Sequence, residues 1–186
     1  MKICLAFLSF FIASLCSAQA KVDTSWMLNG HHFRLILEAD EEAIYDLNAK
    51  AAFFRENTPL LSDSLLCSRL YMNFMDMNGD GFNDLLVFQS AGARANETYH
   101  LFLFRKKTND FVRVEGYEAW PNLYKTKIRG VLAATILSGM VHYRFFLLTD
   151  KGELVDLDIV EEDDNLDGEE FEKGLRRVQK VLKKAR

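Results

Sequence analysis

The sequence predicts a mainly β protein, an antiparallel meander followed by one C-terminal amphipathic helix. Short apolar runs rich in β-branched and aromatic residues recur along the chain, and Gly, Asn and Asp residues separate them. A compact acidic loop links two of these runs. Residues 161–186 change from strongly acidic to strongly basic. We therefore expect a single β domain over residues 21–160, followed by an acidic run and a helix over residues 161–186.

Residues 1–20 have the features of a secretory signal peptide. A basic Lys2 precedes an apolar run over residues 3–15, and an Ala-x-Ala cleavage motif ends at Ala20. The apolar run is too short to serve as a permanent membrane span. Leu15 stands before Cys16, where a lipoprotein signal needs a small residue. We expect cleavage after Ala20, a periplasmic or secreted protein, and no membrane span in the mature chain.

The composition of the mature chain excludes some partners. Cleavage removes Lys2 and leaves 22 basic against 27 acidic residues, a net charge of −5. Nucleic acid is therefore not an expected partner, because binding it requires a basic surface. Cys67 is the one cysteine that remains, so no intramolecular disulfide can form. We expect Cys67 to be a small buried hydrophobic residue rather than a nucleophile.

The apolar runs predict ten strands in order. Residues 21–30 are expected to be a loosely held lead-in, residues 56–63 a loop, and residues 116–125 an irregular connection. The run 99–104 is apolar on both faces, which indicates a sheet covered on both sides or a strand near a propeller axis. The predicted strands are residues 33–37, 43–47, 51–55, 68–75, 84–89, 98–105, 111–114, 128–137, 141–149 and 153–160.

The C-terminal helix is predicted from apolar residues at helical spacing. Phe171, Leu175, Val178 and Leu182 lie on one face of such a helix. Acidic residues precede its first turn and basic residues fill its last turns, which complements the helix dipole. Gly174 lowers the helix propensity of this segment.

A loop of the pattern D-x-N-x-D-G-x-x-D places oxygen ligands at the spacing of a calcium site. The expected ligands are the side chains of Asp76, Asn78, Asp80 and Asp84 and the main-chain carbonyl of Phe82. Calcium takes six to eight oxygen ligands, and the glycine after Asp80 permits the sharp turn that such a loop needs. The pattern therefore predicts Ca²⁺ as the cofactor.

Alternatives to this assignment remain open. Position twelve of the loop is Val87 and an apolar run follows, so the loop is not an EF-hand. The same residues are also common in turns that bind nothing, although neighbouring carboxylates without a cation repel one another. Residues 163–168 repeat the D-x-N-x-D-G order without ligands at positions nine and twelve. We expect that second run to be a solvated stretch of charge.

The segment Asn73-Phe-Met-Asp-Met-Asn-Gly-Asp-Gly-Phe-Asn-Asp-Leu85 is similar to the calcium loop of FG-GAP and VCBS-type β repeats. A longer likeness over residues 68–157 resembles the bacterial periplasmic calcium-binding proteins that are immunity partners of lysozyme-like effectors in type IV secretion. Only the calcium loop is a specific motif in this likeness. The resemblance implies an all-β, propeller-like fold and an inhibitory role. It would make the partner a cell-wall hydrolase.

No enzyme is predicted. The sequence has no G-x-S-x-G, P-loop or dinucleotide motif, and its four histidines lack zinc-site spacing. Two functions fit: a calcium-stabilised protein that binds and inhibits a protein partner, or a secreted structural or adhesive β module. A single calcium loop favours the first. The expected binding surface consists of loops, because loops project from a rigid sheet. The candidates are residues 90–97, residues 116–125 with Trp120 and Tyr124, and residues 138–143. Trp120 beside Pro121 also fits a core position, which we favour slightly over a surface anchor.

Overall fold

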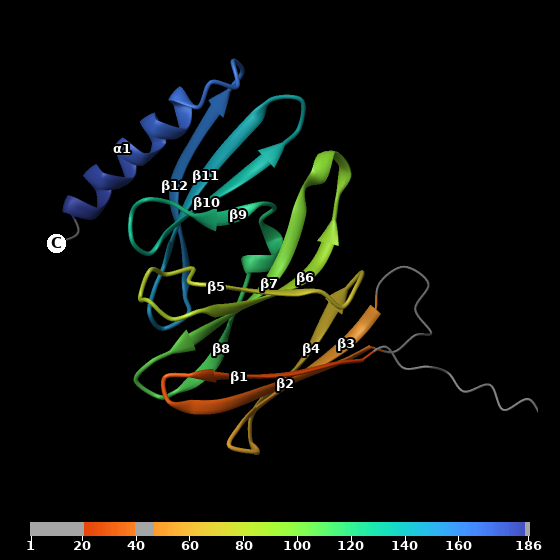
Figure 1. The fold of residues 1–186 in the computed structure, drawn as a ribbon. Helices are drawn as coiled ribbons and strands as arrows, with labels where there is room; N and C mark the ends of the chain where they lie inside the picture. The colour runs from red at the N-terminus through yellow and green to blue at the C-terminus, as the bar shows by residue number, and fades with distance from the viewer. Residues whose placement is uncertain (1–20, 40–46, 185–186) are drawn as a thin grey trace, which may run out of the picture.

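The structure, a computed structural model, describes residues 21–39 and 47–184. The predicted signal peptide and most of the predicted strand 43–47 lie outside these residues. The described part of the chain has no helix long and apolar enough to cross a membrane. It contains β1 (Lys21–Leu28), β2 (His31–Ala39), β3 (Leu47–Arg55), β4 (Thr58–Cys67), β5 (Met72–Met75), β6 (Asp84–Ala91), β7 (Glu97–Arg105), β8 (Asp110–Val114), β9 (Leu123–Lys125), β10 (Val131–Leu137), β11 (Val141–Leu148), β12 (Leu154–Asp163), α1 (Glu169–Lys184) and the 3-10 turns η1 (Ala93–Ala95) and η2 (Tyr117–Ala119) (Figure 1).

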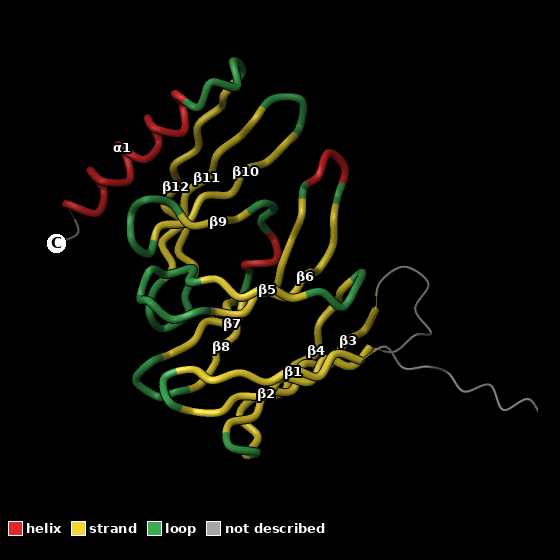
Figure 2. The backbone as a smooth tube through the Cα atoms, viewed as in Figure 1, coloured by secondary structure: helices red, strands yellow, loops and turns green. Residues whose placement is uncertain are grey.

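Within these residues the strands form three separate four-stranded sheets. Sheet A consists of β1–β4, sheet B of β5–β8 and sheet C of β9–β12. Within each sheet, strands that are consecutive in the sequence pair antiparallel, so each sheet is a simple meander. The tube in Figure 2 shows sheet A at one end of the molecule, sheet B in the middle and sheet C beside α1. The prediction of a mainly β, antiparallel protein is confirmed.

Sheets A and B enclose an aromatic core. Phe33 and Phe53 of sheet A contact Phe111 of sheet B, with ring centroids 5.5 and 5.3 Å apart. From sheet B, Phe102 and Phe104 also point into this core. Aromatic side chains bury a large area each, so this layer supplies much of the hydrophobic driving force.

Sheets B and C enclose a second core from the opposite face of sheet B. Leu101 and Leu103 alternate with Phe102 and Phe104 along β7, and they contact a cluster that includes Phe146 of sheet C. All four β7 side chains are at most 1% exposed. Sheet B is therefore covered on both faces, as the apolar run at residues 99–104 predicts.

The helix α1 covers the outer face of sheet C. Leu175 and Val178 pack against Phe145 and Ile159 of the sheet. The predicted helix and its apolar face are confirmed. Gly174, which lowers helix propensity, is buried directly against Phe145, and a Cβ on it would overlap that ring. The glycine thus allows a close approach of helix and sheet.

Two sequence expectations about sheet A are wrong. Residues 21–28 form a regular edge strand, because alternate side chains from Val22 to Leu28 point inward and Trp26 stacks near Phe33 at 6.1 Å. Residues 58–63 belong to β4 rather than to a loop. Pro59 is tolerated because β4 is an edge strand and its pairing with β3 is irregular at that point.

Two connections also differ in detail. Residues 68–71 are not part of a strand, and the predicted strand over 68–75 is shortened to β5. The predicted irregular connection at residues 116–125 contains η2 and the short strand β9. In the same segment Trp120 is partly buried, with its ring 4.9 Å from Phe146.

Cys67 is fully buried, as expected, and burial raises the pKa of its thiol to about 11.

Candidate functional site

The predicted calcium loop connects β5 to β6 at the end of sheet B. Gly79 and Gly81 have φ values of 75° and 90°, a backbone conformation that glycine adopts at little cost. These two residues allow the chain to coil back on itself within the loop. The coil brings the main-chain N–H groups of residues 79–82 toward the side chains that precede them.

Asp76 is the centre of this coil. Its Oδ1 accepts hydrogen bonds from the N–H groups of Gly79 at 2.7 Å and Asp80 at 3.1 Å, and its Oδ2 accepts one from Gly81 at 3.0 Å. Asn78 is only 3% exposed, and its Oδ1 accepts from Asp80 N–H at 3.1 Å. Asp80 Oδ1 in turn accepts from Phe82 N–H at 2.9 Å. The predicted ligand side chains therefore lie on one compact, ordered turn of chain.

Asp84 has a different environment. It is fully buried and its two oxygens accept from Met77 N–H at 2.8 Å and Phe104 N–H at 2.9 Å. The pKa of this carboxyl is raised to about 7: burial is the largest cause, the two N–H donors oppose it, and the charges of Asp80 and Asp76 add to it. Asp84, the first residue of β6, thus connects the start of the loop to β7, the strand that pairs with β6.

The donor set fits calcium in kind. It consists entirely of carboxylate, amide and carbonyl oxygens, which hard cations prefer. Within residues 21–39 and 47–184, however, no three His, Cys, Asp or Glu side chains are grouped closely enough to hold a metal ion. Asp76, Asp80 and Asp84 therefore do not form a three-carboxylate cage in this structure. A calcium ion bound by Asp76 and Asp80 would therefore also need the Asn78 side chain and the Phe82 carbonyl as ligands.

The acidic run at residues 163–168 repeats the hydrogen bonds of the first loop. Asp163 accepts from Leu166 N–H at 2.8 Å and from Gly168 N–H at 3.0 Å, at the same sequence offsets as Asp76 with Gly79 and Gly81. Asp163 is 1% exposed, so the expectation of a fully solvated run is wrong for this residue. The backbone N–H groups offset the cost of burying its carboxylate. Its neighbours Asp164 and Asp167 are exposed, as expected.

The three loops expected to form a binding surface lie together. Asn96 donates from Nδ2 to Leu137 O at 2.9 Å and accepts at Oδ1 from Leu137 N–H at 3.0 Å. Asn122 N–H donates to Glu97 O at 2.8 Å, and Asn122 Nδ2 donates to Thr135 O at 3.1 Å. These two asparagines connect the β6–β7 hairpin, the η2–β9 segment and the β10–β11 hairpin.

The tip of the β6–β7 hairpin has an unusual backbone. Arg94 and Ala95 are adjacent non-glycine residues with φ values of 60° and 56°. Both are exposed, and the Arg94 guanidinium lies over Gly139 of the β10–β11 hairpin. Such left-handed residues cost energy and persist where surrounding contacts hold them. The hairpin tips, both on the upper right of Figure 1, therefore present a defined shape to solvent.

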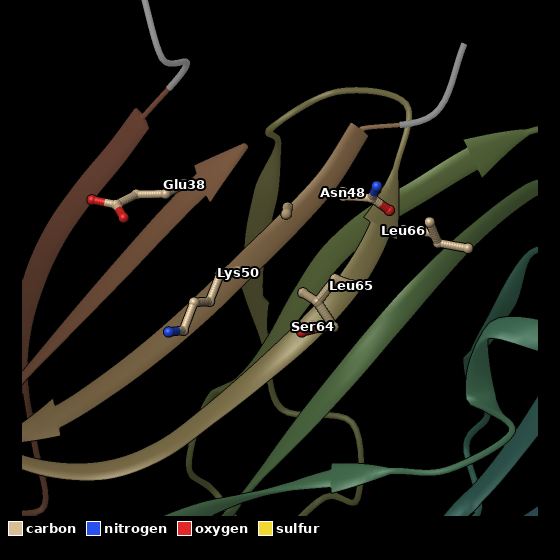
Figure 3. Close-up of a pocket in the computed structure, with 7 residues that line it drawn as sticks. Glu38, Asn48, Lys50, Ser64, Leu65 and Leu66 are labelled. Carbon is tan, nitrogen blue, oxygen red and sulfur yellow. The ribbon is translucent and has the colours of Figure 1, made fainter. Parts of the chain in front are cut away.

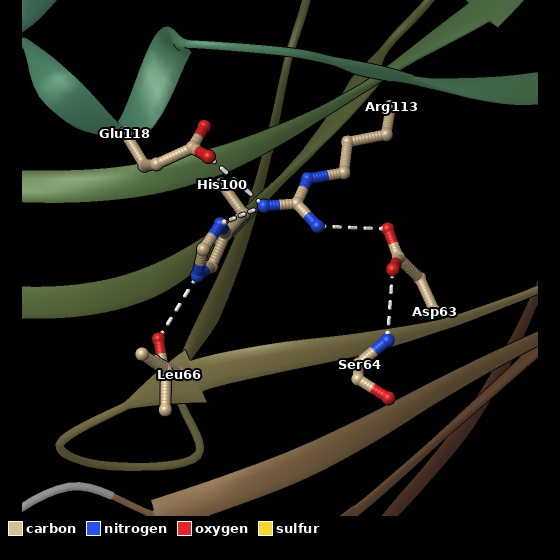
Figure 4. Close-up of polar contacts among 6 residues, drawn as sticks. All are labelled: Asp63, Ser64, Leu66, His100, Arg113 and Glu118. Atoms are coloured by element: carbon tan, nitrogen blue, oxygen red, sulfur yellow. Dashed lines mark hydrogen bonds and ion pairs between the residues drawn. The ribbon is translucent and has the colours of Figure 1, made fainter.

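A polar cluster connects sheets A and B and was not predicted (Figure 4). Arg113 Nη1 donates to Asp63 Oδ2 at 3.1 Å, and its Nη2 donates to Glu118 Oε1 at 2.9 Å. The same Nη2 lies 3.3 Å from Nδ1 of the buried His100. His100 Nε2 lies 2.9 Å from the Leu66 carbonyl oxygen, which can only accept, so Nε2 carries the proton.

The surroundings of His100 favour the neutral form of its ring. Desolvation lowers its pKa from the ordinary value, and the Arg113 charge acts in the same direction. The sequence signal for this cluster is one polar residue within each of two predicted strands, His100 in residues 98–105 and Arg113 in residues 111–114. Sequence alone could not show that these side chains face each other. The cluster contains no nucleophile. Arg113 holds the two acids Asp63 and Glu118 together, and its Nε and the Glu118 Oε2 are buried without a hydrogen-bond partner among the described residues. We assign it a structural role between the sheets.

A shallow concavity lies on sheet A, along β2, β3 and β4 (Figure 3). Its lining combines a few charged side chains with small and aliphatic ones, and it shows no arrangement of acid, base and nucleophile. It therefore adds no catalytic candidate. The lining residues are Glu38, Asn48, Ala49, Lys50, Ser64, Leu65 and Leu66.

Comparison of the chain with protein-family models, with curated proteins and with solved structures gave no match.

Proposed function

We propose that this chain is an exported calcium-binding β protein that acts by binding a protein partner, as an inhibitor or immunity protein of a lysozyme-like cell-wall hydrolase. The observation that carries the binding role is the connection of three loops by Asn96 and Asn122. A partner that meets this end of the molecule contacts a surface held by rigid sheets, so little conformational entropy is lost on binding. The resemblance at residues 68–157 supplies the class of partner.

The proposed calcium site is the loop from Asp76 to Asp84. Asp76, Asn78 and Asp80 would hold the ion together with the Phe82 carbonyl. Asp84 would fix the loop to β7, because it accepts hydrogen bonds from Met77 N–H and Phe104 N–H. A bound cation supplies positive charge near Asp84, whose pKa is raised mainly by burial and in smaller part by the charges of Asp80 and Asp76. Calcium in this role stabilises the fold and takes no part in a reaction.

The finer description of the fold belongs to the same proposal. We propose that the three meanders are arranged as successive blades of a propeller-like assembly. Two observations support this: each sheet is a four-stranded antiparallel meander, and consecutive sheets share a core. A structure in solution or in a crystal would test the relative rotation of the three sheets.

The experiment for the inhibitory role uses the chain from Lys21 onward, titrated into peptidoglycan-hydrolysis assays with several classes of lysozyme-like enzyme. We expect inhibition of at least one class, and at least a tenfold weaker effect for Arg94→Glu. Lys107→Glu is the matched control, since it makes the same charge change in the exposed turn between β7 and β8. Absence of inhibition across all classes, with a folded protein, would favour a structural or adhesive module.

A further inference from the structure

After the first turn of α1, every charged residue of the helix is basic. Residues 173–184 contain six Lys or Arg residues and no acidic residue. This concentration contrasts with the chain as a whole, which has a net charge of −4. The six cations are Lys173, Arg176, Arg177, Lys180, Lys183 and Lys184.

Helical geometry places all six cations on one face. Successive residues of an α-helix are rotated by about 100°, so these six side chains fall within a sector of about 120°. The centre of that sector lies opposite the face formed by Leu175 and Val178, which is buried on sheet C. Figure 1 shows α1 lying along the outside of sheet C, so its far side faces solvent. All six cations are exposed.

Two of the six have partners within the protein. Arg177 and Lys173 form ion pairs with the buried Glu161 of β12, at 2.6 and 3.1 Å. Among the described residues, the other four cations form no salt bridge. They extend from Arg176 to Lys184, about 12 Å along the helix axis. We call this stripe of four the basic face.

The character of the basic face indicates its partner. Protein interfaces obtain most of their affinity from aromatic or apolar anchors in fitted pockets. The basic face has no aromatic side chain, and the half-exposed Val181 lies at its flank. Long, flexible cations without an anchor suit a fluid surface of many anionic groups, and clusters of four or more Lys and Arg on a helix are typical of binding to acidic lipids.

We propose that the basic face of α1 binds the surface of membranes that contain anionic phospholipids. The apolar face of α1 is already covered by sheet C, so the helix rests on the headgroups without inserting. The association is therefore electrostatic, reversible and weakened by salt. This proposal is independent of the calcium loop and of the surface formed by the tips of the β6–β7 and β10–β11 hairpins, which we call the hairpin-tip surface.

Co-sedimentation with vesicles tests this proposal. The chain from Lys21 onward is mixed at 50 mM NaCl with vesicles of phosphatidylcholine alone or with one quarter phosphatidylglycerol. We expect binding to the anionic vesicles only, and release at 500 mM NaCl. Lys180→Glu with Lys183→Glu should weaken binding at least tenfold, because two of four attractive charges are reversed. Both residues are exposed and neither takes part in the ion pairs with Glu161, so the fold is retained.

Lys107→Glu with Lys151→Glu is the matched control, because it makes the same change in net charge at exposed positions away from α1. It should bind as the unchanged protein does. Equal binding to neutral vesicles, or an equal loss in the control, would overturn the proposal. Binding to soluble poly-glutamate without binding to anionic vesicles would also overturn it, in favour of an acidic protein partner.

Discussion

Gly174 of α1 is in such close contact with Phe145 of β11 that a Cβ on the glycine would lie less than 3.0 Å from the ring. Helix propensity and packing therefore make opposite demands at this position. Glycine costs the helix about 1 kcal/mol relative to alanine. Its absence of a side chain nevertheless allows α1 to lie on sheet C.

Gly174→Ala should destabilise the protein by about 1–3 kcal/mol, because overpacking outweighs the gain in helix propensity. Denaturant unfolding measures this change. Gln179→Ala, at an exposed position of the same helix, is the control and should have an effect below about 0.5 kcal/mol. If Gly174→Ala stabilises the protein, the close packing of helix and sheet is absent in solution.

Calcium should raise the thermal stability of the chain. At a calcium concentration 100 times the dissociation constant, the stabilisation is about 2.7 kcal/mol. For a domain of this size this corresponds to a rise in Tm of about 5–10 °C. Asp80→Ala should abolish the rise, since it removes an expected ligand, while Asp167→Ala should retain it. Identical melting curves with calcium and with a chelator would contradict the site, and loss of the effect only in Asp167→Ala would move it to residues 163–168.

His100 should make stability depend on pH. The unfolded residue titrates near 6.5, and the folded residue has a lower pKa because it is buried beside Arg113. As the pH falls below about 6.5, the unfolded state therefore binds more protons than the folded state. Stability should be fully present above that pH and decline in acid, with a slope of up to about 1.4 kcal/mol per pH unit from this group.

His100→Gln provides the test, because the amide can still donate to the Leu66 carbonyl and accept from Arg113. We expect the unfolding free energy of this variant to decline less, or to rise more, between pH 7 and pH 5 than that of the unchanged protein, because the raised pKa of Asp84 acts in the opposite direction to His100. His32→Gln, at a partly exposed position of β2, is the control for the removal of a histidine. An unaltered slope in His100→Gln would show that another group controls the acid behaviour.

Asn96→Ala should loosen the hairpin-tip surface. It removes both hydrogen bonds to the main chain of Leu137, which are partly buried, at a cost of about 1–3 kcal/mol. Hydrogen exchange at the Leu137 amide should become faster, and any inhibition of a hydrolase should weaken with it. Asn73→Ala, at an exposed position of β5, is the comparison variant. Unchanged exchange at Leu137 would show that Asn96 does not hold the two hairpins together.

The sequence predicts most strands because their polarity alternates or their apolar runs are bounded by turn residues. It fails at β1, where Asp23 and Ser25 on the outer face obscure the inward series that includes Trp26. It fails at the start of β4, where Pro59 suggests a loop but the edge of a sheet accommodates it. Edge position is a property of the assembled sheet, and local sequence does not contain it.

The order of residues in the calcium loop predicts the sharp turn after Asp80, and Gly81 has the positive φ that this turn needs, but the order does not predict the N–H groups that bond to Asp76. It does not predict that Asp84 bonds to Phe104 across the sheet, since that partner is 20 residues away. The same limit applies to Asn96 and Leu137, which are separated by 41 residues. Contacts of this kind depend on the register between strands, and no periodicity within either strand encodes it.

Sheet B, covered on both faces, changes how its own strand register is specified. In a half-exposed sheet, a slip of one residue would move apolar side chains into water, and polarity alone forbids it. In β7 such a slip would only exchange Phe102 and Phe104 with Leu101 and Leu103. Side-chain volume must therefore distinguish the two faces, with aromatic rings toward sheet A and leucines toward sheet C. The bond from Phe104 N–H to Asp84 and the contact of His100 Nε2 with the Leu66 carbonyl then supply polar markers of correct alignment within this largely apolar strand.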